Sequence, residues 1–328
     1  MEENSTHAVV PAKKIFNTVG FGLLTVAAVT IGLQLLLNTL AASGVIAVES
    51  AWLRWVLTFA PLYLVGVPLG LLIFRKAPAD RSDGGKLGAG NFLLFLLMCF
   101  PLMYGGNLIG NLLSGLLSGG TAENPLNALA FDESPLRIVV IAVLAPLVEE
   151  FLFRKQLIDR TVRYGEKTAV LLSGLSFGLF HMNLFQFFYA FALGLLFAYL
   201  YVRTRRLRYT VALHMIVNFM GSVVAPHILS HTNMDALAEI SGGQMTPEAM
   251  ADLLPQVGGL MLYAFALITL SIIGLIVLLV KLPKFRFRPA EQELPKNEVF
   301  STVYLRPGYL LFALTCMAVC TLHLLGVA

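Results

Sequence analysis

Apolar residues occur along this chain in long, nearly uninterrupted blocks, and the polar residues are gathered between the blocks. A helix needs about 20 predominantly apolar residues to cross the hydrocarbon core of a bilayer, and most blocks reach that length. Strands of a transmembrane β-barrel would give alternating segments of about 10 residues, which the sequence lacks. The pattern therefore predicts an all-α fold, a polytopic transmembrane helical bundle. We expect about nine spans, at residues 15–42, 52–74, 91–118, 136–158, 168–182, 184–202, 209–229, 256–280 and 308–328.

A polar, proline-containing tract separates the last predicted span from the others. We expect residues 1–280 to form a transmembrane bundle with an eight-helix core. Residues 281–307 are predicted to be a cytoplasmic linker. Residues 308–328 are predicted to be an additional C-terminal transmembrane helix, appended to that core.

The composition excludes two broad classes of protein. Charged residues make up 13% of the chain and apolar residues 57%, with a mean hydropathy of +0.78. Soluble globular proteins carry about 25% charged residues, so a soluble enzyme is excluded, and the apolar content is far too high for a disordered chain. The net charge of +4 does not indicate nucleic-acid binding, because the basic residues flank the apolar blocks instead of forming a patch with aromatic residues. We expect no nucleic-acid partner.

The basic residues also predict the orientation of the chain. If the nine spans alternate in direction, 21 of the 23 Lys and Arg residues fall on one side of the membrane, and Arg54 and Arg137 fall on the other. The positive-inside rule places the basic side in the cytoplasm. We therefore expect a multi-pass protein of the cell membrane with a cytoplasmic N-terminus and an external C-terminus.

The predicted span 136–158 contains three ionisable residues deep in apolar sequence, Glu149, Glu150 and Arg154. Each costs about 2.5–3.5 kcal/mol at the centre of a bilayer by insertion scales, so a structural or functional role must offset this cost. Glu150 and Arg154 lie four residues apart on one helix face, where an ion pair would support the packing of the helices. Glu149 points about 100° away from that face and lacks this cation. A carboxylate in such a place can accept a proton from water.

Two later spans add further polar residues. His181 ends one apolar block, and His214 and Asn218 lie four residues apart on one face of another. A single histidine in a membrane helix is usually a hydrogen-bonding residue. Two histidines, an asparagine and Glu149 on three helices form a set that a bundle can bring together, so we expect them to meet in one site.

These residues form three motifs: Glu-Glu-x-x-x-Arg at 149–154, Phe-x-x-x-His at 177–181 and His-x-x-x-Asn at 214–218. Because the three motifs occur in this order and spacing, the chain resembles the CPBP family. That family comprises the CAAX-processing endopeptidases and bacterial relatives named for bacteriocin processing or immunity. The match covers roughly residues 135–225, where the resemblance places a protease core. The first three and last two predicted spans show no comparable match.

The resemblance implies an intramembrane endopeptidase that hydrolyses a peptide bond in a membrane-embedded or lipidated peptide or protein. By the same resemblance, Glu149 activates a water molecule with the help of His181. His214 and Asn218 would then stabilise the oxyanion of the tetrahedral intermediate. Membrane lipids and the membrane-bound substrate are the partners that this activity implies.

A metal ion is the main alternative for the chemistry. Glu149, His181 and His214 together match a known catalytic zinc ligand set of two histidines and one glutamate. A zinc mechanism also needs a general base, and Glu150, the other nearby carboxylate, is assigned to its ion pair. Asn218 is a poor zinc ligand but a good donor to an oxyanion. We therefore expect a glutamate mechanism without a cofactor, and a zinc metalloprotease is the alternative.

Two functions without proteolysis stay open. Proteins of the same family also act as non-enzymatic membrane immunity factors or scaffolds, and a membrane carboxylate such as Glu149 can serve a proton-coupled transporter. Transporters usually carry ionisable residues or broken helices in several spans, whereas here the polar residues converge on three. Loss of turnover on replacement of Glu149 by Gln would separate a protease from a scaffold.

Overall fold

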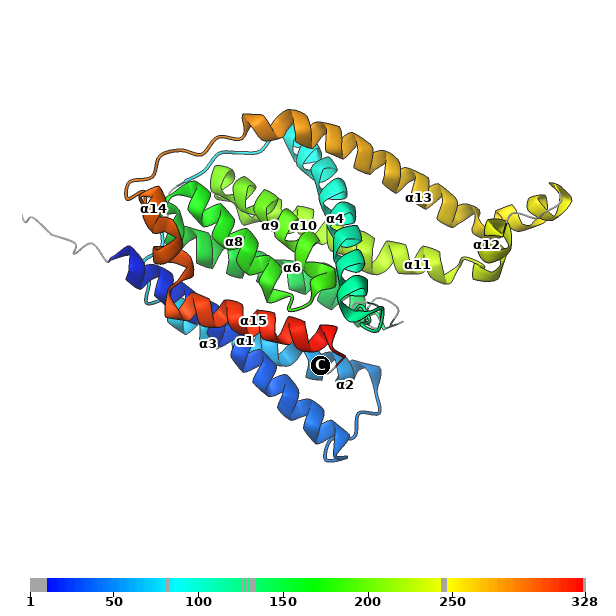
Figure 1. Ribbon diagram of the computed structural model, residues 1–328, viewed down its shortest axis with the longest axis horizontal. Coiled ribbons are helices and arrows are strands. Elements are labelled where there is room, and N and C mark those ends of the chain that lie inside the picture. The colour runs from blue at the N-terminus through cyan, green and yellow to red at the C-terminus, as the bar shows by residue number, and fades with distance from the viewer. Residues whose placement is uncertain are drawn as a thin grey trace, which may run out of the picture.

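The computed structural model describes residues 11–80, 83–125, 127, 129, 132, 134–242 and 247–326, and within these residues the fold is all-α (Figure 1). Seven helical segments are long and apolar enough to cross a membrane by length and composition. They are Ala12–Ala42, Ala51–Phe74, Ala89–Ser118, Leu184–Thr204, Leu207–Ser230, Met250–Lys284 and Pro307–Leu324. The chain is therefore a polytopic helical membrane protein, and seven of the nine predicted spans are confirmed as candidates.

The elements follow one another as α1 (Ala12–Ala42), α2 (Ala51–Ala60), η1 (Pro61–Gly66), α3 (Val67–Phe74), α4 (Ala89–Ser118), η2 (Ile138–Leu144), α6 (Ala145–Glu150), η3 (Phe151–Ile158), α7 (Asp159–Thr161), η4 (Val162–Tyr164), α8 (Glu166–Phe180), α9 (Leu184–Thr204), α10 (Leu207–Phe219), η5 (Met220–Val224), α11 (Ala225–Ser230), α12 (Met234–Ser241), α13 (Pro247–Lys281), η6 (Leu282–Lys284), α14 (Lys296–Val299), η7 (Phe300–Tyr304) and α15 (Pro307–Leu324). The η4 and η6 turns are 3₁₀-helical, and the other η elements are π-helical.

The two remaining predicted spans are helical, but they do not look like ordinary lipid-facing helices. The helical stretch from η2 to η3 covers residues 138–158 of the predicted span 136–158. It carries the ionisable residues of the first motif, which make it more polar than an ordinary membrane-spanning helix. The helix α8 covers most of 168–182 and is only 15 residues long. A bilayer core is about 30 Å thick, so a helix of that length spans it only in part.

The helix α9 lies at the centre of the bundle and is the most buried of the candidate spans. It packs closely on α8 and on α4. Glycines allow both contacts: a Cβ atom at Gly174 would press on Leu195, and one at Gly106 would overlap the backbone of Tyr189. Small residues at such crossings let helix backbones approach each other in a membrane, where no hydrophobic effect drives helices together. The elements that carry the predicted site residues are grouped around α9 (Figure 1).

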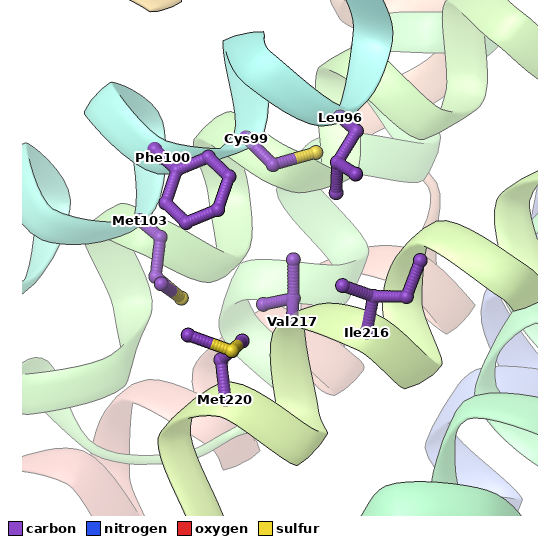
Figure 2. Close-up of a pocket in the computed structure, with 7 residues that line it drawn as sticks. All are labelled: Leu96, Cys99, Phe100, Met103, Ile216, Val217 and Met220. Carbon is purple, nitrogen blue, oxygen red and sulfur yellow. The ribbon is translucent and has the colours of Figure 1, made fainter. Parts of the chain in front are cut away.

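The contact between α4 and α10 is apolar and nearly closed (Figure 2). It encloses a space of about 10 Å³, lined by Leu96, Cys99, Phe100, Met103, Ile216, Val217 and Met220. A space of this size is at most about that of one water molecule and offers it no polar partner. The crossing therefore serves packing, and the candidate site lies elsewhere.

The last helix, predicted as an appendage to an eight-helix core, packs closely within the bundle. A Cβ atom at Gly20 of α1 would overlap the backbone nitrogen of Tyr309 in α15. The side chain of Asn17 accepts a hydrogen bond from the N–H of Gly308 at 2.9 Å. The hydroxyl groups of Ser176 in α8 and Tyr309 lie 3.5 Å apart. The first and last helices therefore form one close pair that rests against α8.

The connections that carry most of the basic residues lie together at one end of the bundle. Arg205 forms ion pairs with Asp80 at 2.6 Å and Asp159 at 3.3 Å, and so joins three of these connections. Arg203 pairs with Glu166, in the same segment as Asp159. We call this end of the bundle, formed by residues 75–80, 159–167, 203–208 and 281–296, the basic face. The structure thus places on one side the segments that the charge pattern assigns to one side.

The segment predicted as a linker, 281–307, is docked onto the basic face. The backbone N–H groups of Gln292 and Leu294 donate to the carbonyl oxygens of Arg163 and Tyr164 at 3.0 and 3.2 Å. The segment also contains α14 and η7. It therefore holds α15 at a fixed position beside α1.

The close pairing of α1 with α15 can be tested at its glycine. We expect Gly20→Ala to lower the melting temperature of the purified protein in detergent. Overpacking costs about 1–3 kcal/mol, more than the roughly 0.5–1 kcal/mol that alanine gains over glycine in a helix. The control is Gly32→Ala in the same helix, where a Cβ atom would meet no atom within 4 Å. Equal melting temperatures for the two variants would contradict the close contact.

Candidate functional site

The helix that carries the first motif is widened on both sides of α6, by the π-helical turns η2 and η3. Within η2 the N–H of Ala145 bonds to the carbonyl oxygen of Val140, five residues back. The next residue is Pro146, which has no N–H, so the carbonyl of Ile141 has no donor in this register. The side-chain Nδ2 of Asn218 donates to that carbonyl at 2.9 Å. Pro146 thus explains why Asn218 binds at this point, and π-helical turns of this kind occur frequently at functional sites.

An ion pair is completely buried beneath the candidate site. Arg154 Nη2 donates to Glu150 Oε1 at 3.1 Å, and Arg154 Nε lies 3.0 Å from Glu150 Oε2. Both side chains are 0% exposed. Arg154 Nη1 also donates to Ser173 Oγ of α8 at 3.1 Å, and that hydroxyl donates to the carbonyl of Phe153 at 2.9 Å. The pair that the spacing predicts therefore forms, and it extends to a neighbouring helix.

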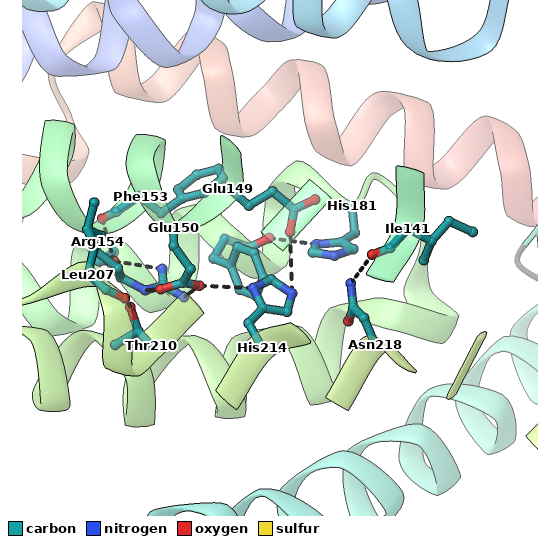
Figure 3. A network of polar contacts seen from close by, with 12 residues as sticks. Ile141, Glu149, Glu150, Phe153, Arg154, His181, Leu207, Thr210, His214 and Asn218 are labelled. Atoms are coloured by element: carbon teal, nitrogen blue, oxygen red, sulfur yellow. Dashed lines mark hydrogen bonds and ion pairs between the residues drawn. The ribbon is translucent and has the colours of Figure 1, made fainter. Parts of the chain in front are cut away.

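The carboxylate of Glu150 has a second partner, which the sequence did not indicate. Nδ1 of His214 in α10 lies 3.0 Å from Glu150 Oε1 (Figure 3). A carboxylate paired with an arginine only accepts hydrogen bonds, so Nδ1 carries the proton of this contact. The other ring nitrogen of His214, Nε2, lies 3.6 Å from Oε2 of Glu149. A chain of polar contacts thus runs from Arg154 through Glu150 and His214 to Glu149.

Glu149 is at the more open end of this chain. Its side chain is 16% exposed, whereas that of Glu150 is 0% exposed. A separation of 3.6 Å is longer than a hydrogen bond, and a water molecule can bridge groups at such distances. Glu149 therefore combines a polar partner with access from outside the packed interior.

His181 lies at the end of α8, on the same helix face as Phe177 and Ser173 at intervals of four residues. Its Nδ1 lies 2.8 Å from the carbonyl oxygen of Phe177, so Nδ1 donates its proton there and Nε2 is left to accept one. The ring of Phe177 meets the rings of His181 and His214 edge-on, with centroids 4.9 and 5.6 Å away. Phe177 therefore orients both histidines.

The structure brings the predicted residues together in two groups. In the first group, His214 is hydrogen-bonded to Glu150 and lies 3.6 Å from Glu149. In the second group, His181 and Asn218 are anchored to backbone carbonyl groups beside them (Figure 3). Among the residues that the structure describes, no hydrogen bond joins Glu149 to His181. The nearest polar partner of Glu149 on another helix is thus His214, whereas the resemblance paired Glu149 with His181.

Three supporting features were missed in the sequence. Ser173 stands two intervals of four residues before His181. That spacing in an apolar helix was a signal that the two polar side chains share one face. The bond from Asn218 to Ile141 had a weaker signal, since Pro146 removes a donor but does not say which group replaces it. The contact between Glu150 and His214 had no signal in the sequence, because it depends on the rotation of two helices.

Glu149, His181 and His214, the candidate zinc ligands, are not gathered around one point in the described structure. Within the described parts of the chain, no three His, Cys, Asp or Glu side chains are grouped so that they could hold one ion. Nδ1 of His214 is engaged by Glu150, and Nδ1 of His181 by a backbone carbonyl group, so Nε2 is the nitrogen of each ring that could bind an ion. Zinc is therefore an alternative cofactor.

Comparisons with known proteins single out the same part of the chain. Residues 131–220 match a family model described as Rce1-like, "Type II CAAX prenyl endopeptidase Rce1-like". The chain is 28% identical over 156 residues to a Bacillus subtilis (strain 168) protein named "Putative membrane peptidase YdiL". That alignment covers 45% of this chain and 63% of the relative, so less than two thirds of the relative is matched. No solved structure matches the chain at a significant level. The matched family segment contains Glu149, Glu150, Arg154, His181, His214 and Asn218.

The buried ion pair predicts different outcomes for the two neighbouring glutamates. We expect Glu150→Gln to lower the free energy of unfolding by about 3–5 kcal/mol, because Arg154 is left as an uncompensated buried charge. Glu149→Gln is the matched control and should cost much less, since this side chain is partly exposed. Unfolding of each variant in detergent, followed by circular dichroism, measures the difference.

A double variant distinguishes loss of charge balance from loss of shape. Adding Arg154→Met to Glu150→Gln removes the unpaired charge, and we expect it to restore part of the lost stability. Equal stability of the Glu149 and Glu150 single variants would contradict the division between the two carboxylates.

Proposed function

We propose that the chain is an intramembrane endopeptidase of the Rce1-like type II CAAX prenyl endopeptidase family, the CPBP family, because residues 131–220 match the model of that family and contain all the predicted site residues. It would hydrolyse a peptide bond in a membrane-associated or lipidated substrate. The observation that carries this proposal is the position of Glu149, partly exposed and 3.6 Å from His214, whose other ring nitrogen is held by the buried Glu150. This arrangement offers a base and a positioned hydrogen-bond donor at one place.

In the proposed reaction, Glu149 is the general base. A water molecule beside its carboxylate gives up one proton to Glu149, and the resulting hydroxide attacks the carbonyl carbon of the substrate. Nε2 of His181 can accept a hydrogen bond from the O–H that the hydroxide keeps, because the Nδ1 proton is already engaged with the carbonyl of Phe177. General-base catalysis by a positioned side chain contributes about 10²–10⁴-fold to a rate.

His214 is the proposed donor to the oxyanion of the tetrahedral intermediate. Its Nδ1 proton is engaged with Glu150, so donation from Nε2 requires the imidazolium form. The two carboxylates of Glu149 and Glu150 balance the charges of that imidazolium and of Arg154, which makes the group neutral as a whole. Buried charges are stable only when they are compensated in this way.

Asn218 is the second proposed donor to the oxyanion. One N–H of its side-chain amide is held by the carbonyl of Ile141, which fixes the orientation of the amide group. An amide nitrogen carries two hydrogens, so one stays available. Donors that are already oriented before the reaction stabilise a developing negative charge most effectively.

The reaction closes with the proton that Glu149 has taken up. The carbon–nitrogen bond of the tetrahedral intermediate breaks, and Glu149 passes its proton to the leaving amine. The products are a carboxylic acid and an amine, which accounts for all atoms of the peptide bond and the water molecule. Glu149 returns to its ionised form for the next cycle.

The proposal includes the topology. The basic face would lie in the cytoplasm, with the N-terminus on the same side and the C-terminus outside, and the protein would cross the cell membrane about nine times. The grouping of the basic connections at one end of the bundle supports this orientation. The two polar helices that carry Glu149 and His181 would be the additional spans.

The proposed proteolysis is tested by Glu149→Gln, which keeps the size of the side chain and removes the base. We expect peptide hydrolysis to fall by about 10²–10⁴-fold while the melting temperature changes little. Quantitative mass spectrometry of membrane peptides, from cells with the wild-type chain or the variant, should show a set of new chain ends that only the wild type produces. Glu298→Gln, at an exposed position of α14, is the control.

Two results would contradict this mechanism. Cleavage that continues unchanged in Glu149→Gln would exclude Glu149 as the base. About one zinc ion per purified chain, with cleavage lost on its removal and restored by its return, would favour a metalloprotease.

The proposed topology is tested by cysteine labelling in intact cells. We expect a cysteine placed at Arg206 to react only after the membrane is opened, and one placed at Glu239 to react with an impermeant reagent from outside. The three native cysteines, Cys99, Cys316 and Cys320, are first replaced by serine or alanine. Reaction of the Glu239 position from the cytoplasmic side alone would overturn the orientation.

A further inference from the structure

A cavity of about 320 Å³ lies on the basic face, away from the candidate catalytic site. Its walls come from the segment before α4 and the start of that helix, from the end of α9, and from the end of α13. Figure 1 shows the start of α4 and the end of α13 meeting at this end of the bundle. The volume is at the lower end of the range of small-molecule sites, about 300–1,000 Å³.

One part of the cavity wall is strongly cationic. Lys86, Lys281, Lys284 and Arg203 line it, and none of the described lining residues is an Asp or a Glu. Arg203 is paired with Glu166, whereas none of the three lysines forms an ion pair with any residue that the structure describes. Lysine binds phosphate as a compact point charge, so three unpaired lysines around one cavity favour an anionic ligand.

Another part of the cavity wall is apolar. Leu94 and Met98 of α4 line it from one side. Leu279, near the end of α13, and Leu282, in η6, do not line the cavity and are 61% and 54% exposed. Such apolar side chains on the surface of a membrane protein face lipid. A small soluble anion would make no favourable contact with apolar side chains. A molecule with both a charged head and a hydrocarbon tail fits the cationic and the apolar parts of the cavity.

The walls are also held in place. Phe285, just after η6, stacks on Tyr199 of α9 with ring centroids 4.0 Å apart and an interplanar angle of 6°. The Tyr199 hydroxyl accepts a hydrogen bond from the N–H of Arg286 at 3.3 Å. On the opposite wall, the N–H of Leu87 donates to the hydroxyl of Tyr209 at 3.1 Å. The cavity is thus built by contacts within the protein and not by a loose chain end.

We propose that this cavity binds an anionic phospholipid. The phosphate lies between Lys86, Lys281 and Lys284, and an acyl chain follows Leu94 and Met98 toward the lipid-facing side of α13. Basic pockets between membrane helices bind anionic headgroups in this way. The bound lipid would join α13, whose outer surface is largely exposed, to α4 at the basic face. This assignment does not depend on the proposed proteolysis.

The test is native mass spectrometry of the full-length protein in detergent, titrated with phosphatidylglycerol or with phosphatidylcholine. We expect one phosphatidylglycerol to bind in preference to phosphatidylcholine. Each lysine near an anionic lipid strengthens binding about fivefold, so Lys281→Gln with Lys284→Gln should weaken the binding about 30-fold. The same positions changed to Arg should retain it.

Two controls separate a defined site from general attraction to a basic surface. Lys13→Gln with Lys14→Gln makes the same change in net charge at exposed positions outside the cavity, and we expect it to leave binding unchanged. Asn91→Trp keeps every charge but fills the cavity, and we expect it to weaken binding as well. Melting temperatures in the absence of added lipid confirm that each variant is folded.

Three outcomes would overturn the proposal. Equal weakening by the changes at Lys13 and Lys14 would assign binding to the net charge of the protein. Equal binding of the two lipids would remove the role of the anionic headgroup. Displacement of phosphatidylglycerol by glycerol 3-phosphate at the same concentration would assign the cavity to a soluble phosphate compound.

Discussion

The completely buried pair of Glu150 and Arg154 is the constraint on which the rest of the site depends. Two charges taken out of water are tolerated only when their remaining hydrogen-bonding groups also find partners. Arg154 meets this requirement through Ser173 of α8, and Glu150 meets it through His214 of α10. The need to satisfy one ion pair therefore fixes the relative positions of three helices. Because these are the helices of the three motifs, the pair also fixes the distance between Glu149 and His214.

This arrangement gives two adjacent carboxylates different environments and different roles. Glu150 is enclosed and holds an arginine and a histidine, while Glu149, one residue earlier and on another face of the helix, is partly exposed. The π-helical turns on both sides of α6 widen the helix around the pair, and Pro146 frees the carbonyl that orients Asn218. Local irregularity of the helix and buried charge thus act together to present polar groups inside an apolar bundle.

The surroundings of the site follow from the bilayer as solvent. Helices in lipid associate through close packing and hydrogen bonds, and here glycines let the first helix approach the last, and α4 approach α9. At the basic face, where water is available, ion pairs around Asp159 and Arg205 hold the connecting segments together. The cavity with Lys281 and Lys284 lies at the boundary between the apolar packing of the helices and the ion pairs of the basic face. The headgroup of a lipid would lie at the same boundary.

The sequence by itself determined the features that depend on local periodicity and charge. Block length predicted seven helices that the structure has as candidate spans, and the four-residue spacing predicted the pair of Glu150 and Arg154. The charge pattern grouped connections that the structure places together at one end of the bundle. Only the tertiary structure decided the contacts between helices: Glu150 with His214, Asn218 with Ile141, and the last helix against the first. Such contacts depend on how each helix is rotated and how closely it approaches its neighbour. Apolar blocks that face lipid and protein alike do not encode that rotation, so the partners of the site residues could not be inferred from their spacing.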